Sequence, residues 1–242
     1  MARNMFPVAI LAGGLATRLR PRTETIPKAL IEIGGEPFLA HQLRLLNRYG
    51  IERVVLCIGH RGEQIQQYAG NGRRFGVHIE YSYDGPRLLG TAGALRQALT
   101  MLGESFFVLY GDSYLPCDYR AVEQTFLDSG KLGLMTVFHN EGKLDTSNVE
   151  FSGGRLLAYD KELRTPRMRH IDYGLGVLRS AAFAALPDRQ PYDLATLYRD
   201  LLARDELAAH EVGERFYEVG SFAGIRELEE FLCNSASTRA LR

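Results

Sequence analysis

The chain has 242 residues, of which 45% are hydrophobic and 24% are charged, and its 29 basic residues balance its 29 acidic ones. A net charge of zero argues against non-specific binding to nucleic acid or to an anionic membrane. No apolar run approaches the ~20 residues of a membrane helix, and three widely separated cysteines argue against a disulfide framework. We therefore expect a cytoplasmic protein with a single domain over residues 1–242.

Apolar segments alternate with helical patterns through the first half of the chain. Strands are expected at 7–11, 53–59, 77–83 and 105–112, and helices at 37–50, 61–70 and 91–102. Thr91 is expected to cap the third helix. Continuous apolar strands separated by helices indicate a parallel sheet that is covered on both faces.

The second half of the chain changes character. A hairpin is expected to turn at Gly153-Gly154, followed by strands at 170–179 and 215–220 and by helices at about 192–204 and 221–234. Ser221 is expected to cap the last helix. The predicted fold is α/β: a Rossmann-like, mixed and mostly parallel sheet flanked by helices, with a small β-rich lid region.

The turn after the first strand reads Ala12-Gly13-Gly14. Glycines let a phosphate approach the backbone closely, and open α/β sheets bind ligands at the carboxyl ends of their strands. Neither GxGxxG nor GK[ST] is present. Arg18 and Lys28 flank the turn, as binding of a polyanion would require. From these residues alone, a plain turn with solvated arginines is the alternative.

The longer string "LAGG-x-x-T-R-L-x-P", followed by "PK", resembles the signature of the sugar-1-phosphate nucleotidylyltransferase family. "LLGTAGAL" at 88–95 and "VLYGDSY" at 108–114 are similar to further motifs of that family and come in the same order. The resemblance implies catalytic roles for Arg18, Lys28 and Asp112. It also implies a nucleotide site made of Leu11, Ala12, Gly13, Gly14, Asp84, Gly90 and Thr91.

The resemblance further implies Mg²⁺ bound between Asp112 and Glu218. The family usually has aspartate at the second position, and glutamate can also supply the oxygen ligands that Mg²⁺ requires. Sugar-phosphate contacts are implied at Asn148, Asp160, Lys161, Asp172 and Gly174. Polar residues that close turns are the alternative for Asn148, Asp160 and Asp172. The nucleotide part would span about 1–140 and the sugar-phosphate part about 141–242.

The reaction that the resemblance implies joins a nucleoside triphosphate to a sugar 1-phosphate and releases pyrophosphate. The match is strongest to short bacterial guanylyltransferases for heptose or mannose 1-phosphate. Uridylyl, thymidylyl or cytidylyl transfer, including transfer to phosphocholine, stays open, as does a non-catalytic nucleotide-sugar-binding relative. A glycosyltransferase is disfavoured because "GDSY" lacks the second carboxylate of an Asp-x-Asp motif. Nucleic acid and membrane are not expected partners, and a homo-oligomer is left open.

Overall fold

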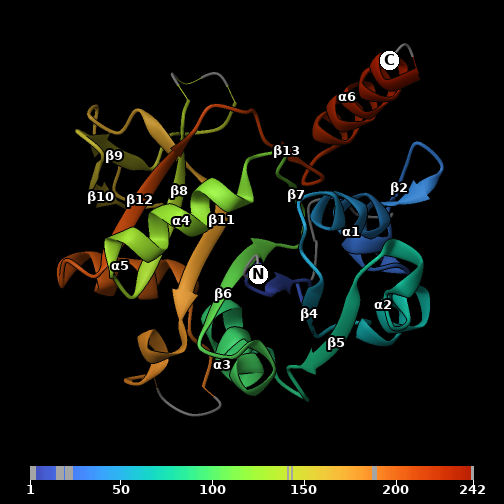
Figure 1. Ribbon diagram of the computed structural model, residues 1–242, viewed down its shortest axis with the longest axis horizontal. Coiled ribbons are helices and arrows are strands. Elements are labelled where there is room, and N and C mark those ends of the chain that lie inside the picture. Colours follow the sequence, from blue (N-terminus) through green and yellow to red (C-terminus); the bar gives the residue numbers. More distant parts are fainter. Residues whose placement is uncertain are drawn as a thin grey trace.

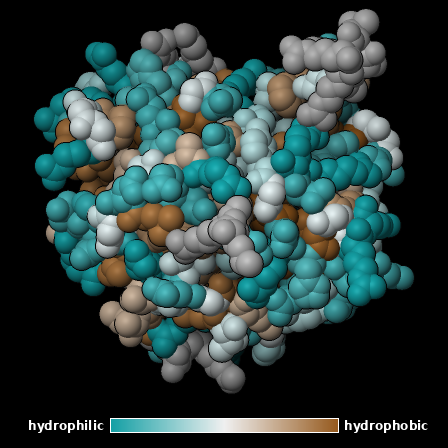
Figure 2. All heavy atoms as spheres, in the orientation of Figure 1, coloured by the Kyte–Doolittle hydropathy of each residue, from teal (hydrophilic) through white to brown (hydrophobic). Residues whose placement is uncertain are grey.

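The computed structural model describes residues 4–14, 19, 24–140, 142, 144–186 and 190–240, with side chains described to residue 235. Within these ranges, no helix combines the length and apolar character needed to cross a membrane. On the face seen in Figure 2, hydrophilic side chains cover most of the surface, and hydrophobic ones are visible in small groups between them.

One nine-stranded sheet forms the centre of the described structure. Its parallel half has the order β5 (His78–Tyr83), β4 (Arg53–Ile58), β1 (Val8–Leu11) and β6 (Ser105–Tyr110). The other half is mixed, with β11 (His170–Arg179) antiparallel to both β6 and β8 (Gly133–His139), and β12 (Leu207–Val212) parallel to β8. These strands confirm the predicted mixed, mostly parallel α/β architecture.

Helices cover both faces of this sheet (Figure 1). One face carries α1 (Phe38–Arg48), α2 (Gly62–Ala69) and α4 (Tyr119–Ser129), and the other carries α3 (Gly90–Leu102) and α5 (Leu194–Ala203). Side chains of β1 alternate between the two cores, because successive residues of a strand point to opposite faces. Val8 and Ile10 join one core, whereas Ala9 joins the other.

The predicted hairpin is confirmed as β9 (Val149–Ser152) and β10 (Arg155–Tyr159), with Gly153 and Gly154 at φ values of +57° and +75°. It extends the central sheet, because β9 pairs with the first residue of β11. The elements α4, β8 and β12 were not predicted. Asp118 is a residue type that favours a helix N-cap, and it accepts hydrogen bonds from two N–H groups of the first turn of α4.

A third core joins the short elements beside the main sheet. It contains residues of β2 (Glu32–Ile33), β7 (Ser113–Tyr114) and α6 (Phe222–Ala240), and Tyr217 of β13 (Tyr217–Glu218) packs against it. The short helix η3 (Lys28–Leu30) instead contributes Ala29 to the core under α1, α2 and α4. The far end of α6 projects from the body of the molecule (Figure 1). The predicted cap is confirmed, since Ser221 Oγ accepts a hydrogen bond from Gly224 N at 3.1 Å. The predicted strand at 215–220 shrinks to Tyr217–Glu218.

Candidate active site

The glycine turn lies where β1, β4 and β6 end side by side. Ala12 N donates to Cys57 O at 2.9 Å, and Gly111 N donates to Leu11 O at 3.0 Å, so backbone hydrogen bonds tie the three strand ends together. A Cβ on Gly111 would lie 2.3 Å from Leu11 O, which no side chain can satisfy without moving the backbone. The glycine of the Gly-Asp pair therefore lets β6 approach β1, and Asp112 follows directly into the shared edge.

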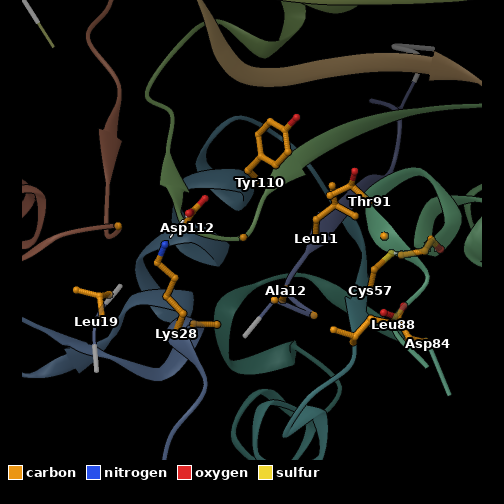
Figure 3. A pocket seen from close by; sticks show the side chains of 17 residues that line it. Leu11, Ala12, Leu19, Lys28, Cys57, Asp84, Leu88, Thr91, Tyr110 and Asp112 are labelled. Atoms are coloured by element: carbon orange, nitrogen blue, oxygen red, sulfur yellow. Dashed lines mark hydrogen bonds and ion pairs between the residues drawn. The ribbon is translucent and has the colours of Figure 1, made fainter. Parts of the chain in front are cut away.

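Lys28 and Asp112 meet at this edge, although 84 residues separate them in the chain. Lys28 Nζ donates to Asp112 Oδ2 at 2.6 Å, and the two side chains are 17% and 29% exposed. Lys28 starts the short helix η3, whereas Asp112 follows a buried strand. The close-up shows the ammonium and the carboxylate pointing toward one another (Figure 3). An anionic ligand at this edge could replace Asp112 as the partner of Lys28.

A cavity of about 390 Å³ extends from this pair along the strand ends. Its walls include nine of the residues predicted to bind nucleotide or to act in catalysis: Leu11, Ala12, Gly13, Gly14, Lys28, Asp84, Gly90, Thr91 and Asp112. Tyr110, Cys57, Leu88 and Gly220 also line it, and sequence analysis gave them no site role. Arg18 lies outside the described residues, and its neighbour Leu19 lines the cavity.

Asp84 lies at the end of the cavity away from Lys28, next to Leu88 and Cys57 (Figure 3). It follows β5, and its Oδ2 accepts a long hydrogen bond from Leu89 N at 3.4 Å. Burial raises the pKa of this carboxyl, and the hydrogen bond from Leu89 partly opposes that effect. Cys57 is buried and its thiol has a pKa raised to about 12 by burial, so it packs as a small apolar side chain.

The expected cap of α3 by Thr91 is wrong. The helix begins at Gly90, and its first N–H groups are satisfied by a carbonyl from a distant segment: Ala92 N and Gly93 N donate to Tyr192 O at 2.9 and 3.2 Å. Thr91 Oγ1 instead accepts from Leu194 N at 2.6 Å. A tertiary contact replaced the local cap because these backbone groups are buried and must find partners.

Gly90 is needed for this same contact. Its φ is +71°, and a Cβ on it would lie 2.7 Å from Tyr192 O. Gly90 therefore allows the segment around Tyr192 to pack against the start of α3. Gly90 and Thr91 also line the cavity.

Glu218 reaches the same region through the small sheet of β7 and β13. Its backbone pairs with Ser113, and Val219 N donates to Asp112 O at 2.9 Å. Glu218 is exposed, and Gly220 rather than Glu218 is among the cavity-lining residues. Of the two predicted metal carboxylates, Asp112 therefore lines the cavity, whereas Glu218 lies on the strand that pairs with the residue after it and does not line the cavity.

The Asp112 carboxylate in the cavity wall fits the needs of Mg²⁺, which takes oxygen ligands and usually keeps water and substrate phosphate in its shell. Among the described residues, no three His, Cys, Asp or Glu side chains gather closely enough to hold a metal by themselves. The donor set therefore fits an ion that is held partly by substrate.

The sugar-side residues predicted from the sequence lie around Asp172 of β11. Asp172 accepts hydrogen bonds from Gly174 N at 3.0 Å and from Tyr159 OH at 3.3 Å, and its own N–H donates to Asn148 Oδ1 at 2.9 Å. Burial raises the pKa of Asp172, and the positive charge of Lys161 opposes that rise. The pairing of β11 with β8 shifts register between Asp172 and Gly176, so the strand is irregular at this point.

Lys161 and Tyr110 connect this group to the cavity. Lys161 Nζ lies 5.4 Å from the centre of the Tyr110 ring, and Tyr110 also lines the cavity. Gly174, with φ +94°, lies near Ser113, since a Cβ on it would be 3.3 Å from Ser113 Oγ. The fold therefore brings the predicted sugar-side residues next to the predicted nucleotide site.

Asp160 and Asn148 already have structural partners. Asp160 Oδ1 accepts from Leu163 N and Glu162 N at 2.9 and 2.8 Å, and these hydrogen bonds lower its pKa. Its other oxygen lies 3.5 Å from Arg199. Asn148 supports the backbone of Asp172, as described above. Asp160 thus closes a turn, whereas Asn148 joins two segments that are 24 residues apart in the chain.

Gly176 of β11 packs directly against Tyr198 of α5. A Cβ on Gly176 would lie 2.1 Å from the hydroxyl oxygen of Tyr198. We expect Gly176→Ala to lower the free energy of unfolding by about 1–3 kcal/mol through overpacking. Adding Tyr198→Phe removes the clashing oxygen and should restore part of that loss. Urea denaturation of the two single variants and the double variant measures this, and purely additive losses would contradict the contact.

A glycine-bounded cavity at the carboxyl edge of a mostly parallel sheet defines an α/β protein of the nucleotide-binding class. The family model described as "Nucleotidyl transferase" matches residues 8–147. This chain belongs to the nucleotidyl transferase family.

The relatives of this chain differ in length, so the chain covers different shares of them. It is 38% identical over 233 residues to N-acetylmuramate alpha-1-phosphate uridylyltransferase of Neisseria meningitidis serogroup B, which covers 91% of this chain and 95% of the relative. It is 28% identical over 201 residues to UTP–glucose-1-phosphate uridylyltransferase of Synechocystis, covering 76% of this chain. It is also 37% identical over 132 residues to mannose-1-phosphate guanylyltransferase catalytic subunit beta of Drosophila melanogaster, covering 53% of this chain. The chain spans 52% and 36% of the length of these last two relatives.

Solved structures share the fold at lower sequence identity. A Bacillus anthracis protein proposed to be a glucose-1-phosphate thymidylyltransferase has a TM-score of 0.82 at 19% identity, with 94% of each chain covered. HddC from Yersinia pseudotuberculosis, complexed with GMP-PN, has a TM-score of 0.79 at 21% identity, covering 94% of this chain and all of that one. These likenesses show the Rossmann-like fold.

Proposed function

We propose that this protein is a sugar-1-phosphate nucleotidyltransferase that forms a nucleoside diphosphate sugar and pyrophosphate. The observation that carries the proposal is the contact between Lys28 and Asp112 in the wall of a cavity that Tyr110 also lines, together with the position of Lys161 over the Tyr110 ring. Two anionic substrates can meet there, because positive charge is available on both sides of the junction.

In the proposed reaction, a phosphate oxygen of the sugar 1-phosphate attacks the α-phosphorus of the triphosphate. The bond from that phosphorus to the bridging oxygen breaks, and pyrophosphate takes the electron pair. The attacking phosphate is already ionised at neutral pH, so the reaction needs no general base. Catalysis then depends on alignment and on charge neutralisation.

Lys28 donates to the charge that grows at the α-phosphate, once the incoming phosphate replaces Asp112 as its partner. Lys161 orients the sugar phosphate, and Arg18 is assigned from the sequence to the leaving pyrophosphate. Asp112 and Glu218 would hold Mg²⁺, which when bound supplies further neutralisation of phosphate charge. Asp172 accepts a hydrogen bond from a sugar hydroxyl within this scheme.

Guanylyl transfer to heptose or mannose 1-phosphate is the first pairing that we propose. Uridylyl transfer is the second candidate, favoured by the likeness to the Neisseria uridylyltransferase along nearly its whole length. A matrix of nucleoside triphosphates against sugar 1-phosphates, scored by pyrophosphate release with Mg²⁺, distinguishes them. We expect release only where both substrates are present.

The outcome of this matrix also separates the rival functions. Tight nucleotide binding with no pyrophosphate from any pair would support a non-catalytic relative. In a parallel incubation with a nucleoside diphosphate sugar, transfer of the sugar with release of the nucleoside diphosphate would support a glycosyltransferase. Either result would contradict the proposed reaction.

A further inference from the structure

Tyr110, the last residue of β6, lies between the two predicted halves of the active site. It lines the cavity that also contains Lys28 and Asp112, and its hydroxyl points away from Lys28 (Figure 3). On the sugar side, its ring is a neighbour of Lys161. No step of the proposed reaction uses this ring, although it touches both sides of the junction.

The Tyr110 ring is held in place by its neighbours. The strand β6 pairs with β1 and β11 inside the central sheet, with Leu11 as the register partner of Tyr110. The partly buried ring packs against the core under α3 and α5. Gly174 of β11 passes close to its edge, since a Cβ built on Gly174 would lie 3.4 Å from Tyr110 Cδ2. The ring therefore offers a fixed surface to other side chains.

The ammonium of Lys161 lies over this surface. Its Nζ is 5.4 Å from the ring centroid, which is close enough for the negative face of the ring to attract it. In the part of the chain that the structure describes, Lys161 forms no ion pair with a carboxylate, whereas Lys28 is paired with Asp112 at 2.6 Å. An aromatic face orients a cation without neutralising it, so the charge of Lys161 stays available to a phosphate.

We propose that Tyr110 is a positioning residue, whose ring holds the Lys161 ammonium on the sugar side of the cavity before the sugar 1-phosphate binds. This inference rests on the proposed function, which assigns the sugar phosphate to Lys161. Tyr110 then acts through Lys161 and contacts no reacting atom.

The flexibility of lysine explains why such a surface matters. A lysine side chain loses much rotamer freedom when its ammonium is fixed by a ligand. If the ring has already ordered Lys161, the sugar phosphate meets a smaller entropic cost on binding. Loss of the ring should therefore raise the KM for the sugar 1-phosphate and leave kcat nearly unchanged.

Steady-state pyrophosphate release tests this, with the substrate pair that reacts fastest in the matrix described above. In Tyr110→Leu, the KM for the sugar 1-phosphate should rise about 3–10-fold, the size of one cation–π contact. The KM for the triphosphate should not follow it. Tyr110→Phe keeps the ring and loses only the hydroxyl, so it should retain the wild-type KM values.

Tyr68→Leu is the matched control. Tyr68 of α2 carries Arg74 at 4.2 Å from its ring centroid, and Tyr68 does not line the cavity. Removing this second cation–π contact should leave the KM for the sugar 1-phosphate unchanged.

A double-variant cycle shows whether Tyr110 acts through Lys161. Lys161→Ala should itself raise the KM for the sugar 1-phosphate. Adding Tyr110→Leu should then change that KM by less than about 2-fold, because the cation that the ring holds is already absent. Multiplicative effects of the two changes would overturn the inference.

Fluorinated rings provide a test that needs no large change in packing. Fluorine withdraws electron density from the ring face and adds little volume, so it weakens the attraction for a cation. Phenylalanine and its mono-, di- and trifluorinated forms are introduced at position 110. The KM for the sugar 1-phosphate should rise with each added fluorine. A ring that only fills space would give no such order, and a flat series would overturn the inference even if Tyr110→Leu fails to fold.

NMR of the free protein tests the contact without substrate. Protons above an aromatic face shift upfield, so the Cε protons of Lys161 in protein with ¹³C-labelled lysine should give an upfield signal that disappears in Lys161→Ala. The signal should return to the region of exposed lysines in Tyr110→Leu and stay upfield in Tyr110→Phe. Absence of an upfield Lys161 signal in the wild type would contradict the contact.

These results separate the inference from the proposed function. Normal pyrophosphate release with an unchanged sugar 1-phosphate KM in Tyr110→Leu overturns the positioning role alone. A raised KM in Tyr110→Phe equal to that in Tyr110→Leu assigns the effect to the hydroxyl and also overturns it. If no pair of substrates releases pyrophosphate, the proposed function fails and the positioning role fails with it, whatever the NMR signal of Lys161 shows.

Discussion

Replacing Lys28 by alanine is expected to lower turnover by about 10²–10³-fold, the usual loss when one donor to a developing charge is removed. The ammonium is the described cation that contacts Asp112 in the cavity, and in the proposed reaction it follows the charge onto the α-phosphate. Because it acts mainly in the transition state, we expect the loss in kcat rather than in the KM of either substrate. Steady-state pyrophosphate release measures both quantities.

Lys131 provides a matched control for this variant. It forms an ion pair of similar length, 2.8 Å, with Asp205, and this pair does not line the cavity. Lys131→Ala should keep wild-type turnover. The melting temperature of Lys28→Ala should stay close to that of wild type, because a partly exposed ion pair contributes only about 0–1 kcal/mol. Near-normal turnover in Lys28→Ala would remove Lys28 from the mechanism.

Replacing Asp112 by asparagine is expected to cost turnover on a similar scale, about 10²–10³-fold. Asparagine keeps the shape of the side chain and its place after β6, so the change removes charge with little change in packing. Two functions are lost together: the ion pair that holds Lys28, and an oxygen ligand suited to Mg²⁺. A Mg²⁺ titration of activity should show a higher half-saturating concentration in Asp112→Asn. The matched control Asp205→Asn should leave the half-saturating Mg²⁺ concentration unchanged.

Combining the two changes tests whether the pair acts as a unit. The double variant Lys28→Ala/Asp112→Asn should lose much less than the product of the single losses, because each single change already disrupts the same group. Fully multiplicative losses would show that Lys28 and Asp112 act independently. An unchanged half-saturating Mg²⁺ concentration in Asp112→Asn would contradict the role of Asp112 as a metal ligand. The double variant would then test only its role as the ion-pair partner of Lys28.

Much of the candidate site was predictable because it follows strands that are recognisable locally. The apolar runs that become β1 and β6 each end in a glycine-containing turn, and parallel strands end at the same edge of a sheet. Asp112 was therefore expected near Gly13 before any contact was known. Lys28 is different, because η3 is held by the burial of Ala29 in the core under α1, and the approach of Lys28 to Asp112 is a long-range contact.

Residues from later in the chain were harder to predict. Tyr198 lies on α5, and only the fold brings it to Gly176 of β11. Tyr192 satisfies the start of α3 from about 100 residues away, which explains why the local capping prediction for Thr91 is wrong. No sequence pattern marks such pairs, since the hydrogen bond and the clash depend on how two distant segments cross.

Local patterns were sufficient to predict the alternation of strands and helices, the glycine turn and the order of the motifs, because periodicity and turn chemistry act between near neighbours. Packing in three dimensions is what brings Lys28 to Asp112 and places Asn148 against the backbone of Asp172. These features depend on burial and on contacts between distant segments, which arise when the strands and helices pack together.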